Sequence, residues 1–353
     1  VWIEFMKNIF IGNRKVGQAQ GCFLIAEIAQ AHDGSLGIAH SYIDAVADAG
    51  ADAIKFQTHI AEAESTRKEQ FRVNFSYEDS TRYDYWKRME FTERQWLGLK
   101  DHCDSVGIIF LSSVFSVEAV QMLEKIGMPG WKVGSGEVNN PLILDAMLKT
   151  SSPILLSSGM SDWDEIDGSV ALLSDHPPGS ALFQCTSKYP TRLKEVGLNV
   201  VKDMKHKYNL PIGLSDHSGS TSPAFAAICS GVDLLEFHVV FDKKMFGPDS
   251  QSSLDFGQLR EVIKFRDDYL EMQNNPVDKD SVAEEMKTMK GLFNKSLVLK
   301  RALAKGSILQ RDDFTAKKPG TGIAVQFINQ CVGKTLIDDF SKDHFLSWDD
   351  MTT

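Results

Sequence analysis

Two lysines lie inside short apolar runs of the sequence, where a charged side chain needs a specific reason to be placed. Lys55 falls within the run Ala53–Thr58, and Lys132 falls within Trp131–Gly136. Burying an ammonium group without a partner costs a great deal of free energy. We therefore interpret both lysines as ligands of a bound anion, with a structural ion pair as the alternative.

Hydroxyl groups recur at the ends of similar apolar runs, in Ser112-Ser113, Ser157-Ser158 and Thr186-Ser187. Lysines and hydroxyls together suit a substrate that carries phosphate and carboxylate groups. Two glutamates, Glu27 and Glu137, stand close to these groups along the chain. Either they act directly on the substrate or they neutralise the two lysines.

Two histidines, His217 and His238, stand at the ends of two further apolar runs. If those runs are neighbouring strands, about 4.8 Å apart, both imidazoles can reach one ion. A pair of imidazoles with open coordination positions suits a divalent Lewis acid, first Mn²⁺, with Mg²⁺ or Co²⁺ as alternatives. Taken singly, each histidine is more often a satisfied core group.

The elements that must position these side chains are short strands alternating with amphipathic helices. Near-continuous apolar strands separated by helices indicate a parallel sheet that is buried on both faces. Eight such units over roughly 250 residues are typical of a (β/α)₈ barrel, whose strand ends meet at one mouth. The runs are Phe23–Ala29, Ala53–Thr58, Ile108–Val114, Trp131–Gly136, Ile154–Ser158, Ala181–Thr186, Ile212–Ser215 and Leu234–Phe241.

Helical patterns between the runs include Leu36–Ala49, Glu93–Ser105, Val117–Ile126 and Asp162–Leu173. A doubly wound open sheet is the alternative, but no run is followed by a GxGxxG motif or a P-loop. The segment His59–Glu90 interrupts the alternation and is rich in aromatic residues. We expect it to form an ordered excursion over the barrel mouth; a packing elaboration is equally compatible.

The pattern also divides the chain into domains. We predict a barrel domain over residues 1–272, a charged linker over 273–291 and a small β-rich domain over 292–353. The small domain contains a weak repeat, because Lys305–Phe314 resembles Lys342–Met351. A unit of about 60 residues is marginally stable alone, so we expect it to pack on another surface.

Composition narrows the class of partner and compartment. The formal net charge of −10 argues against nucleic acid or an anionic membrane as the main ligand. No apolar run has membrane-spanning length, and no cleavage signal follows the apolar start. The five cysteines are scattered and form no CxxC motif, so we expect reduced thiols in a cytoplasmic protein.

Taken in order, these segments resemble the successive motifs of the N-acetylneuraminate (sialic acid) synthase family. The motifs are Ile25–Ile28, Ala51–Gln57, Lys132–Glu137, Cys185–Pro190, Gly213–His217, Glu236–His238 and Gly247–Asp249. Lys317–Ile323 is similar to a segment of the family's C-terminal SAF, or antifreeze-like, domain. The resemblance covers nearly the whole chain, which makes it far more specific than any single motif.

The resemblance implies that phosphoenolpyruvate (PEP) condenses with an open-chain N-acyl hexosamine to a nine-carbon 2-keto acid and phosphate. It also implies a homodimer in which the small domain of one chain closes the barrel of the other. The implied PEP ligands are Lys55, Ser113, Lys132, Ser135, Ser187 and Ser215, and the metal ligands are His217 and His238. The residues that face the sugar and the reacting carbons are Glu27, Gln57, Glu137, Tyr189 and Asp249, of which Glu27, Glu137 and Asp249 would be catalytic.

Two positions depart from the family pattern. Ser187 stands where the family often has Asn, and Lys318 stands where the family has an Arg that contacts the N-acyl group of the sugar. Lysine lacks the planar fork of arginine, so the identity of the acyl sugar stays open. Two other function classes also stay open: a Schiff-base aldolase that uses Lys55 or Lys132, and an inactive sugar-binding protein of surface polysaccharide assembly.

Overall fold

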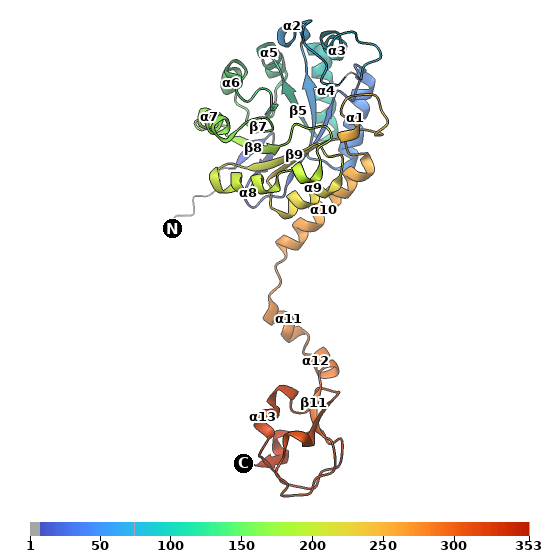
Figure 1. Ribbon diagram of the computed structural model, residues 1–353, viewed down its shortest axis with the longest axis vertical. Helices are drawn as coiled ribbons and strands as arrows, with labels where there is room; N and C mark the ends of the chain where they lie inside the picture. The colour runs from blue at the N-terminus through green and yellow to red at the C-terminus, as the bar shows by residue number, and fades with distance from the viewer. Residues whose placement is uncertain (1–7, 74, 353) are drawn as a thin grey trace. The chain divides into compact units, whose positions relative to one another are not determined.

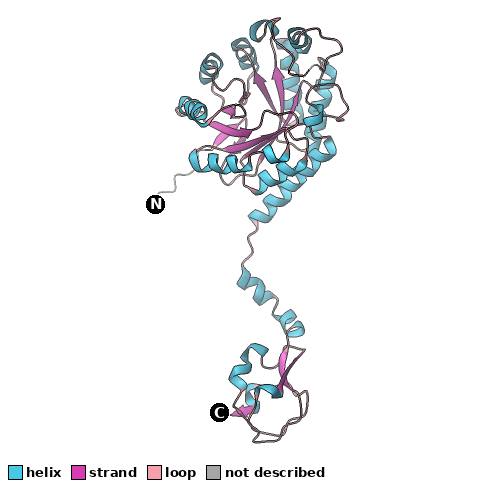
Figure 2. Ribbon diagram, viewed as in Figure 1, coloured by secondary structure: helices cyan, strands magenta, loops and turns pink. Residues whose placement is uncertain are grey.

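The computed structural model describes residues 8–73 and 75–352 and separates into two compact units, one ending at Asn274 and one beginning at Asn275. The first unit is a closed barrel of eight parallel strands surrounded by helices, which confirms the predicted (β/α)₈ fold (Figures 1 and 2). The strands are β3 (Phe23–Ala29), β4 (Ala53–Thr58), β5 (Ile109–Val114), β6 (Trp131–Val133), β7 (Ile154–Ser157), β8 (Ser180–Cys185), β9 (Ile212–Asp216) and β10 (Leu234–His238).

The strands agree with the predicted runs to within one residue, except at two carboxyl ends. Strand β6 stops at Val133 because Gly134 begins a turn, in which its carbonyl accepts from the Glu137 amide at 2.9 Å. Strand β10 stops at His238, and the next residue, Val239, forms an isolated parallel bridge with Leu254. The first correction places Ser135 and Glu137 on the turn after β6.

The outer helices are amphipathic and pack their apolar faces on the barrel. Helix α1 begins after the N-cap Ser35 and ends before Gly50, whose φ of 92° suits a residue without a Cβ. The four helices predicted from the sequence are confirmed to within a residue. The helices are α1 (Leu36–Ala49), α4 (Glu93–Val106), α5 (Val117–Ile126), α6 (Pro141–Leu148), α7 (Trp163–Leu173), α8 (Leu198–Lys207), α9 (Thr221–Cys229) and α10 (Phe256–Asn274).

The amino end of the barrel is filled with apolar side chains. A hairpin of β1 (Ile9–Ile11) and β2 (Arg14–Val16), which the sequence did not reveal, buries Ile9, Ile11 and Val16 against the inward-facing residues of the strands. Those residues include Phe23, Ile25, Leu111, Leu155 and Phe183. Polar side chains are therefore concentrated at the opposite, carboxyl end.

The excursion after β4 is an ordered structure with its own apolar cluster. It contains helices α2 (Ala61–Glu64) and α3 (Arg82–Met89). Buried Ala61, Tyr85, Trp86 and Met89 pack together with the partly buried Phe71, Phe75 and Tyr83.

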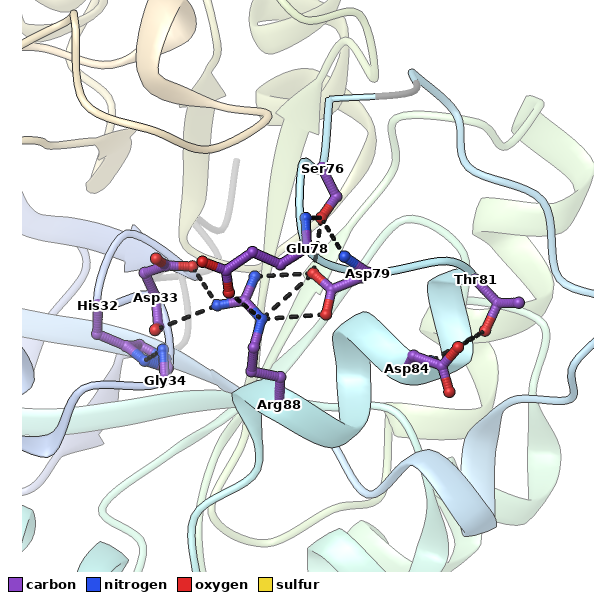
Figure 3. A network of polar contacts seen from close by, with 9 residues as sticks. All are labelled: His32, Asp33, Gly34, Ser76, Glu78, Asp79, Thr81, Asp84 and Arg88. Atoms are coloured by element: carbon purple, nitrogen blue, oxygen red, sulfur yellow. Dashed lines mark hydrogen bonds and ion pairs between the residues drawn. The ribbon is translucent and has the colours of Figure 1, made fainter.

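A network around Arg88 fastens the excursion to the turn after β3 (Figure 3). Arg88 donates to both carboxylate oxygens of Asp79, at 2.8–3.2 Å, and to Asp33 Oδ1 at 2.6 Å. A Cβ on Gly34, whose φ is 74°, would lie 2.5 Å from the Arg88 carbonyl oxygen, so the two segments touch closely.

The second unit begins with helices α11 (Lys279–Glu285) and α12 (Lys287–Phe293), which occupy most of the predicted linker. Its small core is formed by Leu297, Leu299, Phe314, Leu346 and neighbours. The remaining elements are β11 (Ser296–Leu299), η3 (Arg311–Asp313), β12 (Phe314–Lys317), η4 (Val325–Phe327), α13 (Ile328–Cys331), β13 (Thr335–Leu336), η5 (Trp348–Asp350) and β14 (Met351–Thr352).

The weak sequence repeat corresponds to a repeated turn. Asp313 accepts from the Gln310 amide at 2.9 Å, and Asp350 accepts from the Ser347 amide at 2.7 Å. In each copy a 3₁₀ turn is followed by a short strand. The repeated Asp residues are thus explained by local structure rather than by chemistry.

All five cysteines are free. Within the described ranges, no helix is both long and apolar enough to cross a bilayer. The predicted compartment stays a prediction.

Candidate active site

A cavity of about 450 Å³ opens at the carboxyl ends of the strands. Every site residue predicted on the barrel lines it: Glu27, Lys55, Gln57, Ser113, Lys132, Ser135, Glu137, Ser187, Tyr189, Ser215, His217, His238 and Asp249. Lys318 belongs to the second unit, where its ammonium lies 5.0 Å from the centre of the Phe293 ring.

Four buried charged groups form the floor of this cavity. Lys55 contacts Glu27 directly, donates to Ser113 Oγ at 2.9 Å and lies 3.7 Å from Glu236. Lys132 lies 3.2 Å from Glu236 Oε1. We call Glu27, Lys55, Lys132 and Glu236 the charge quartet.

Strand register explains one of these contacts and barrel closure explains another. Glu27 and Lys55 are direct partners on β3 and β4, so their side chains are adjacent. Lys132 and Glu236 stand on β6 and β10, which lie on opposite sides of the closed barrel. Their side chains meet because both point into the narrow barrel interior.

The charges of the quartet are set by burial and by mutual attraction. Burial raises the pKa of Glu27 to about 7, against the attraction of Lys55. Burial also favours neutral Glu236, but Lys132 and Lys55 outweigh it and lower its pKa to about 2. Burial would lower the pKa of Lys55, yet Glu236 and Glu27 together raise it.

For Lys132 burial dominates, and its pKa is lowered. An anion entering beside Lys132 and Lys55 would favour their charged forms. The floor of the cavity therefore presents two lysines that can bind an anionic ligand. It also presents one carboxyl group, that of Glu27, which can exchange a proton near neutral pH.

Small groups surround Gly159 next to the quartet. A Cβ at this position would lie 2.5 Å from Ser187 Oγ, 2.7 Å from Ser135 Oγ and 2.9 Å from Cys185 Sγ. The Gly159 amide donates to Ser135 Oγ at 3.1 Å. The hydroxyls of Ser135 and Ser187, which both line the cavity, therefore lie close together. We call this pair the serine cradle, because two such hydroxyls are suitable partners for phosphate oxygens.

Replacing Gly159 with alanine should damage this cradle. The added methyl group would push the two serine hydroxyls away, so we expect the KM for an anionic substrate to rise roughly tenfold, or about 1.4 kcal/mol. Gly168→Ala on α7 is the matched control, because a Cβ there meets no atom within 4 Å. Equal Michaelis constants for both variants would contradict the cradle.

The predicted metal pair is also brought together. The rings of His217 and His238 have their centres 5.2 Å apart. His217 Nδ1 lies 3.0 Å from the Thr186 carbonyl oxygen, and its Nε2 lies 3.1 Å from the Tyr189 hydroxyl. If Nδ1 donates to the carbonyl, Nε2 keeps its lone pair on the cavity side.

These two imidazoles fit a divalent ion. Burial lowers the pKa of His238 well below its usual value, which favours the neutral ligand form. Burial also disfavours charged His217, but Cys185, the Thr186 carbonyl and Glu236 together raise the pKa of His217, which opposes ion binding there. No group of three or more protein ligands occurs among the described residues, so substrate or water would complete the coordination.

The remaining predicted residues lie nearer the mouth. Asp249 accepts from Arg72 at 3.1 Å, and burial nevertheless raises the pKa of Asp249. Glu137 accepts from the Asn140 side chain at 2.6 Å and makes no ion pair with either quartet lysine. The sequence left open whether Glu27 and Glu137 neutralise the two lysines or act on the substrate. Neutralisation of a lysine applies to Glu27 and not to Glu137.

Several cavity residues were missed as site residues. Glu236 lies in an apolar strand as Lys55 does, and the same burial argument could have found it. Ser157 accepts from Lys132 at 2.6 Å, and its position at a strand end was the available signal. Arg72 and His59 line the cavity from the excursion, and no local pattern points to them.

A closed (β/α)₈ barrel with buried lysines paired to carboxylates in a cavity at its mouth has the arrangement of an enzyme active site. Comparison with known proteins then identifies the family. Residues 42–276 match the NeuB family, and residues 294–352 match the SAF domain. The chain belongs to the NeuB family, and the resemblance found from the motifs is confirmed.

Two of the relatives are named sugar-acid synthases. N,N'-diacetyllegionaminic acid synthase of Legionella pneumophila is 30% identical and covers 96% of this chain and 98% of its own. N-acetylneuraminate-9-phosphate synthase of Homo sapiens is 32% identical, and the match covers 94% of this chain and 92% of the human protein.

A solved structure of N-acetylneuraminic acid synthetase from Leptospira borgpetersenii, in complex with citrate, has a TM-score of 0.70 at 28% identity. It covers 81% of this chain and 98% of that one. The protein is an enzyme of the sugar-acid synthase type.

Proposed function

We propose that the protein condenses PEP with the open-chain form of an N-acyl hexosamine, giving a nine-carbon 2-keto sugar acid and inorganic phosphate. The charge quartet is the observation that carries the proposal. It places Lys55 and Lys132 beside the serine cradle in one cavity. PEP carries both a carboxylate and a phosphate, and this donor set suits both.

The PEP half of the site would use two hydroxyls that contact the quartet and the two hydroxyls of the serine cradle. Ser113 accepts from Lys55, and Ser215 donates to Glu236 at 2.9 Å. Ser135 and Ser187 lie around Gly159. An entering anion would replace these internal contacts with charge-assisted hydrogen bonds, which are roughly twice as strong as neutral ones.

The reaction requires proton transfer as well as binding. The methylene carbon of PEP attacks the aldehyde carbon, water adds at C2 of the PEP fragment, and phosphate then leaves. Water addition calls for a carboxylate base. Glu27, with a pKa of about 7, Asp249, with a raised pKa, and Glu137 are the candidates that line the cavity.

His217 and His238 would hold a divalent ion, Mn²⁺ in the first instance. When bound, such an ion supplies Lewis acidity for the negative charge that develops on the aldehyde oxygen. Gln57 and Tyr189 line the same cavity and would contact the sugar.

The acceptor is proposed as a class, N-acetylmannosamine or a related acyl amino sugar. The relatives differ in the acid named for them, legionaminic acid for one and N-acetylneuraminate 9-phosphate for another. The decisive experiment is phosphate release from PEP across a panel of N-acyl hexosamines, with and without Mn²⁺. Release that needs both a sugar and the ion supports the proposal; sugar-independent release or none contradicts it.

A Schiff-base aldolase is the competing enzyme class. It needs a neutral lysine nucleophile, and the lowered pKa of Lys132 makes that residue the one it would use. Borohydride reduction during turnover separates the classes. A substrate mass trapped on Lys132 would favour the aldolase.

We also propose that the enzyme acts as a homodimer in which the SAF domain of one chain closes the barrel of the other. The family resemblance supports this arrangement. Helix α12 offers a surface for it, because Met289, Leu292 and Phe293 are all exposed. Exposed apolar side chains of this kind commonly mark an interface.

Lys318 tests the sugar half of the proposal. If Lys318 takes the position of the family arginine, Lys318→Ala should weaken sugar affinity by roughly 1–2 kcal/mol, the value of one charge-assisted hydrogen bond. The KM for PEP should not change, and Lys318→Arg should be tolerated. Unchanged constants for both substrates in Lys318→Ala would mean that Lys318 is only a solvated turn residue beside its Phe293 contact.

A further inference from the structure

Arg72 places a guanidinium group at the mouth of the cavity. It comes from the excursion, outside the motifs that identify the family. Its Nη2 donates to Asp249 Oδ1 at 3.1 Å, and its guanidinium carbon lies 4.2 Å from the centre of the Tyr189 ring. Both partners are among the residues that would face the sugar and the reacting carbons. Arg72 thus lies next to the acceptor rather than next to the quartet.

The excursion holds Arg72 in this place by packing and by ion pairs. Its apolar cluster is formed around Tyr85 and Trp86. The Arg88 network ties the end of the excursion to the turn after β3 (Figure 3). A side chain on such a supported segment can present a fixed donor geometry to a ligand.

Most of the donor capacity of Arg72 is unused. A guanidinium has five N–H donors, and the contact with Asp249 is the one hydrogen bond found for Arg72 among the described residues. Its side chain is 42% exposed. The group therefore has donors left for a ligand in the cavity.

The neighbours of Arg72 on the excursion indicate what kind of ligand Arg72 would bind. Phe71, Val73 and Phe75 line the same cavity as Arg72, and they are apolar. Because Asp249 already balances the charge of Arg72, a second anion is not required. A neutral carbonyl oxygen attached to a small alkyl group satisfies both features: the oxygen accepts from the guanidinium, and the alkyl group packs on the apolar side chains.

We propose that Arg72, together with Phe71, Val73 and Phe75, recognises the N-acyl group of the acceptor sugar. This assignment rests on the proposed function. It gives the barrel unit its own guanidinium fork for the acyl carbonyl, independent of Lys318. The excursion is then a specificity element of the site rather than a packing elaboration.

The test compares acceptor preference in Arg72→Ala and wild type. The probes are N-acetylmannosamine, or the best acyl sugar of the panel, and the parent hexose that lacks the acylamino group. We expect the ratio of kcat/KM between the two sugars to fall at least tenfold in Arg72→Ala. The KM for PEP should stay within about twofold, since Arg72 does not touch the quartet.

The matched control is Arg67→Ala. Arg67 lies on the same excursion, pairs with Asp84 at 3.4 Å and stacks 5.1 Å from the Tyr83 ring centre, but it does not line the cavity. It should keep the wild-type preference. Arg72→Lys keeps the charge next to Asp249 but loses the planar fork, so its preference should lie between those of wild type and Arg72→Ala.

An unchanged preference for the acyl sugar in Arg72→Ala would overturn the assignment. So would an equal rise of the Michaelis constants for the two sugars. If wild type releases no phosphate with any sugar, the proposed function fails separately. In that case, isothermal titration of the acyl sugar into wild type and Arg72→Gln, each saturated with PEP, tests whether Arg72 contributes to sugar binding. Equal binding to both proteins, or no binding to either, would refute its role.

Discussion

Lys132→Met should lower kcat/KM for PEP by about 10³-fold, which corresponds to about 4 kcal/mol of transition-state stabilisation. Lys132 donates to Ser157 at 2.6 Å and faces Glu236 at 3.2 Å across the barrel. Its loss removes a buried cation from the anion site and leaves Glu236 with less compensation. Truncating one partner of a buried charge pair typically costs 2–5 kcal/mol.

A double variant separates catalysis from stability. Lys132→Met alone should lower the Tm, because Glu236 keeps a buried charge whose nearest cation, Lys55, is 3.7 Å away. Adding Glu236→Gln should restore much of the Tm without restoring activity, since the anion site still lacks its lysine. The measurements are thermal unfolding and steady-state phosphate release.

Lys125→Met is the control for this series. Lys125 forms an exposed ion pair with Glu93 at 2.9 Å, and exposed pairs contribute at most about 1 kcal/mol. It should keep wild-type activity and stability. Full activity in Lys132→Met would contradict the assignment of the PEP site.

Removing the divalent ion should have the second large effect. Treatment with EDTA should lower kcat by about 10²–10³-fold, because Lewis-acid stabilisation of developing charge is worth several kcal/mol. Mn²⁺ should restore turnover. The two ring centres 5.2 Å apart and the neutral state of His238 are the structural basis for this expectation.

Direct binding of the ion provides an independent readout. Titration of Mn²⁺ into His238→Ala should show lost or strongly weakened binding, while the far-UV spectrum of the protein stays unchanged. His206→Ala, which removes an exposed histidine on α8, should bind Mn²⁺ as wild type does. Full turnover in the chelated enzyme would contradict the metal site.

The barrel was predictable because its elements carry local signals. A strand such as β3 is buried along its whole length, so it appears in the sequence as an unbroken apolar run. Helices such as α4 and α7 begin with capping boxes, Thr92 with Gln95 and Asp162 with Glu165, that are visible in the sequence. The hairpin β1–β2 was missed, because strands of three residues carry too little pattern.

The site was predictable to the extent that topology fixes where strand ends go. Parallel strands of a barrel bring their carboxyl ends to one mouth, so Lys55, Lys132 and His217 had to converge whatever the details of packing. The family resemblance then supplied the proposed roles, which the structure by itself does not test. The sequence alone thus determined the fold and the family, and every site residue that it predicted on the barrel lines the cavity.

The tertiary structure decided the partners within the cavity. Lys132 and Glu236 are more than a hundred positions apart and stand on opposite strands, and they meet only because the sheet closes. The excursion brings Arg72 to Asp249 through aromatic packing and the Arg88 network. Local sequence patterns report burial and periodicity, whereas such contacts depend on how distant segments close around a shared space.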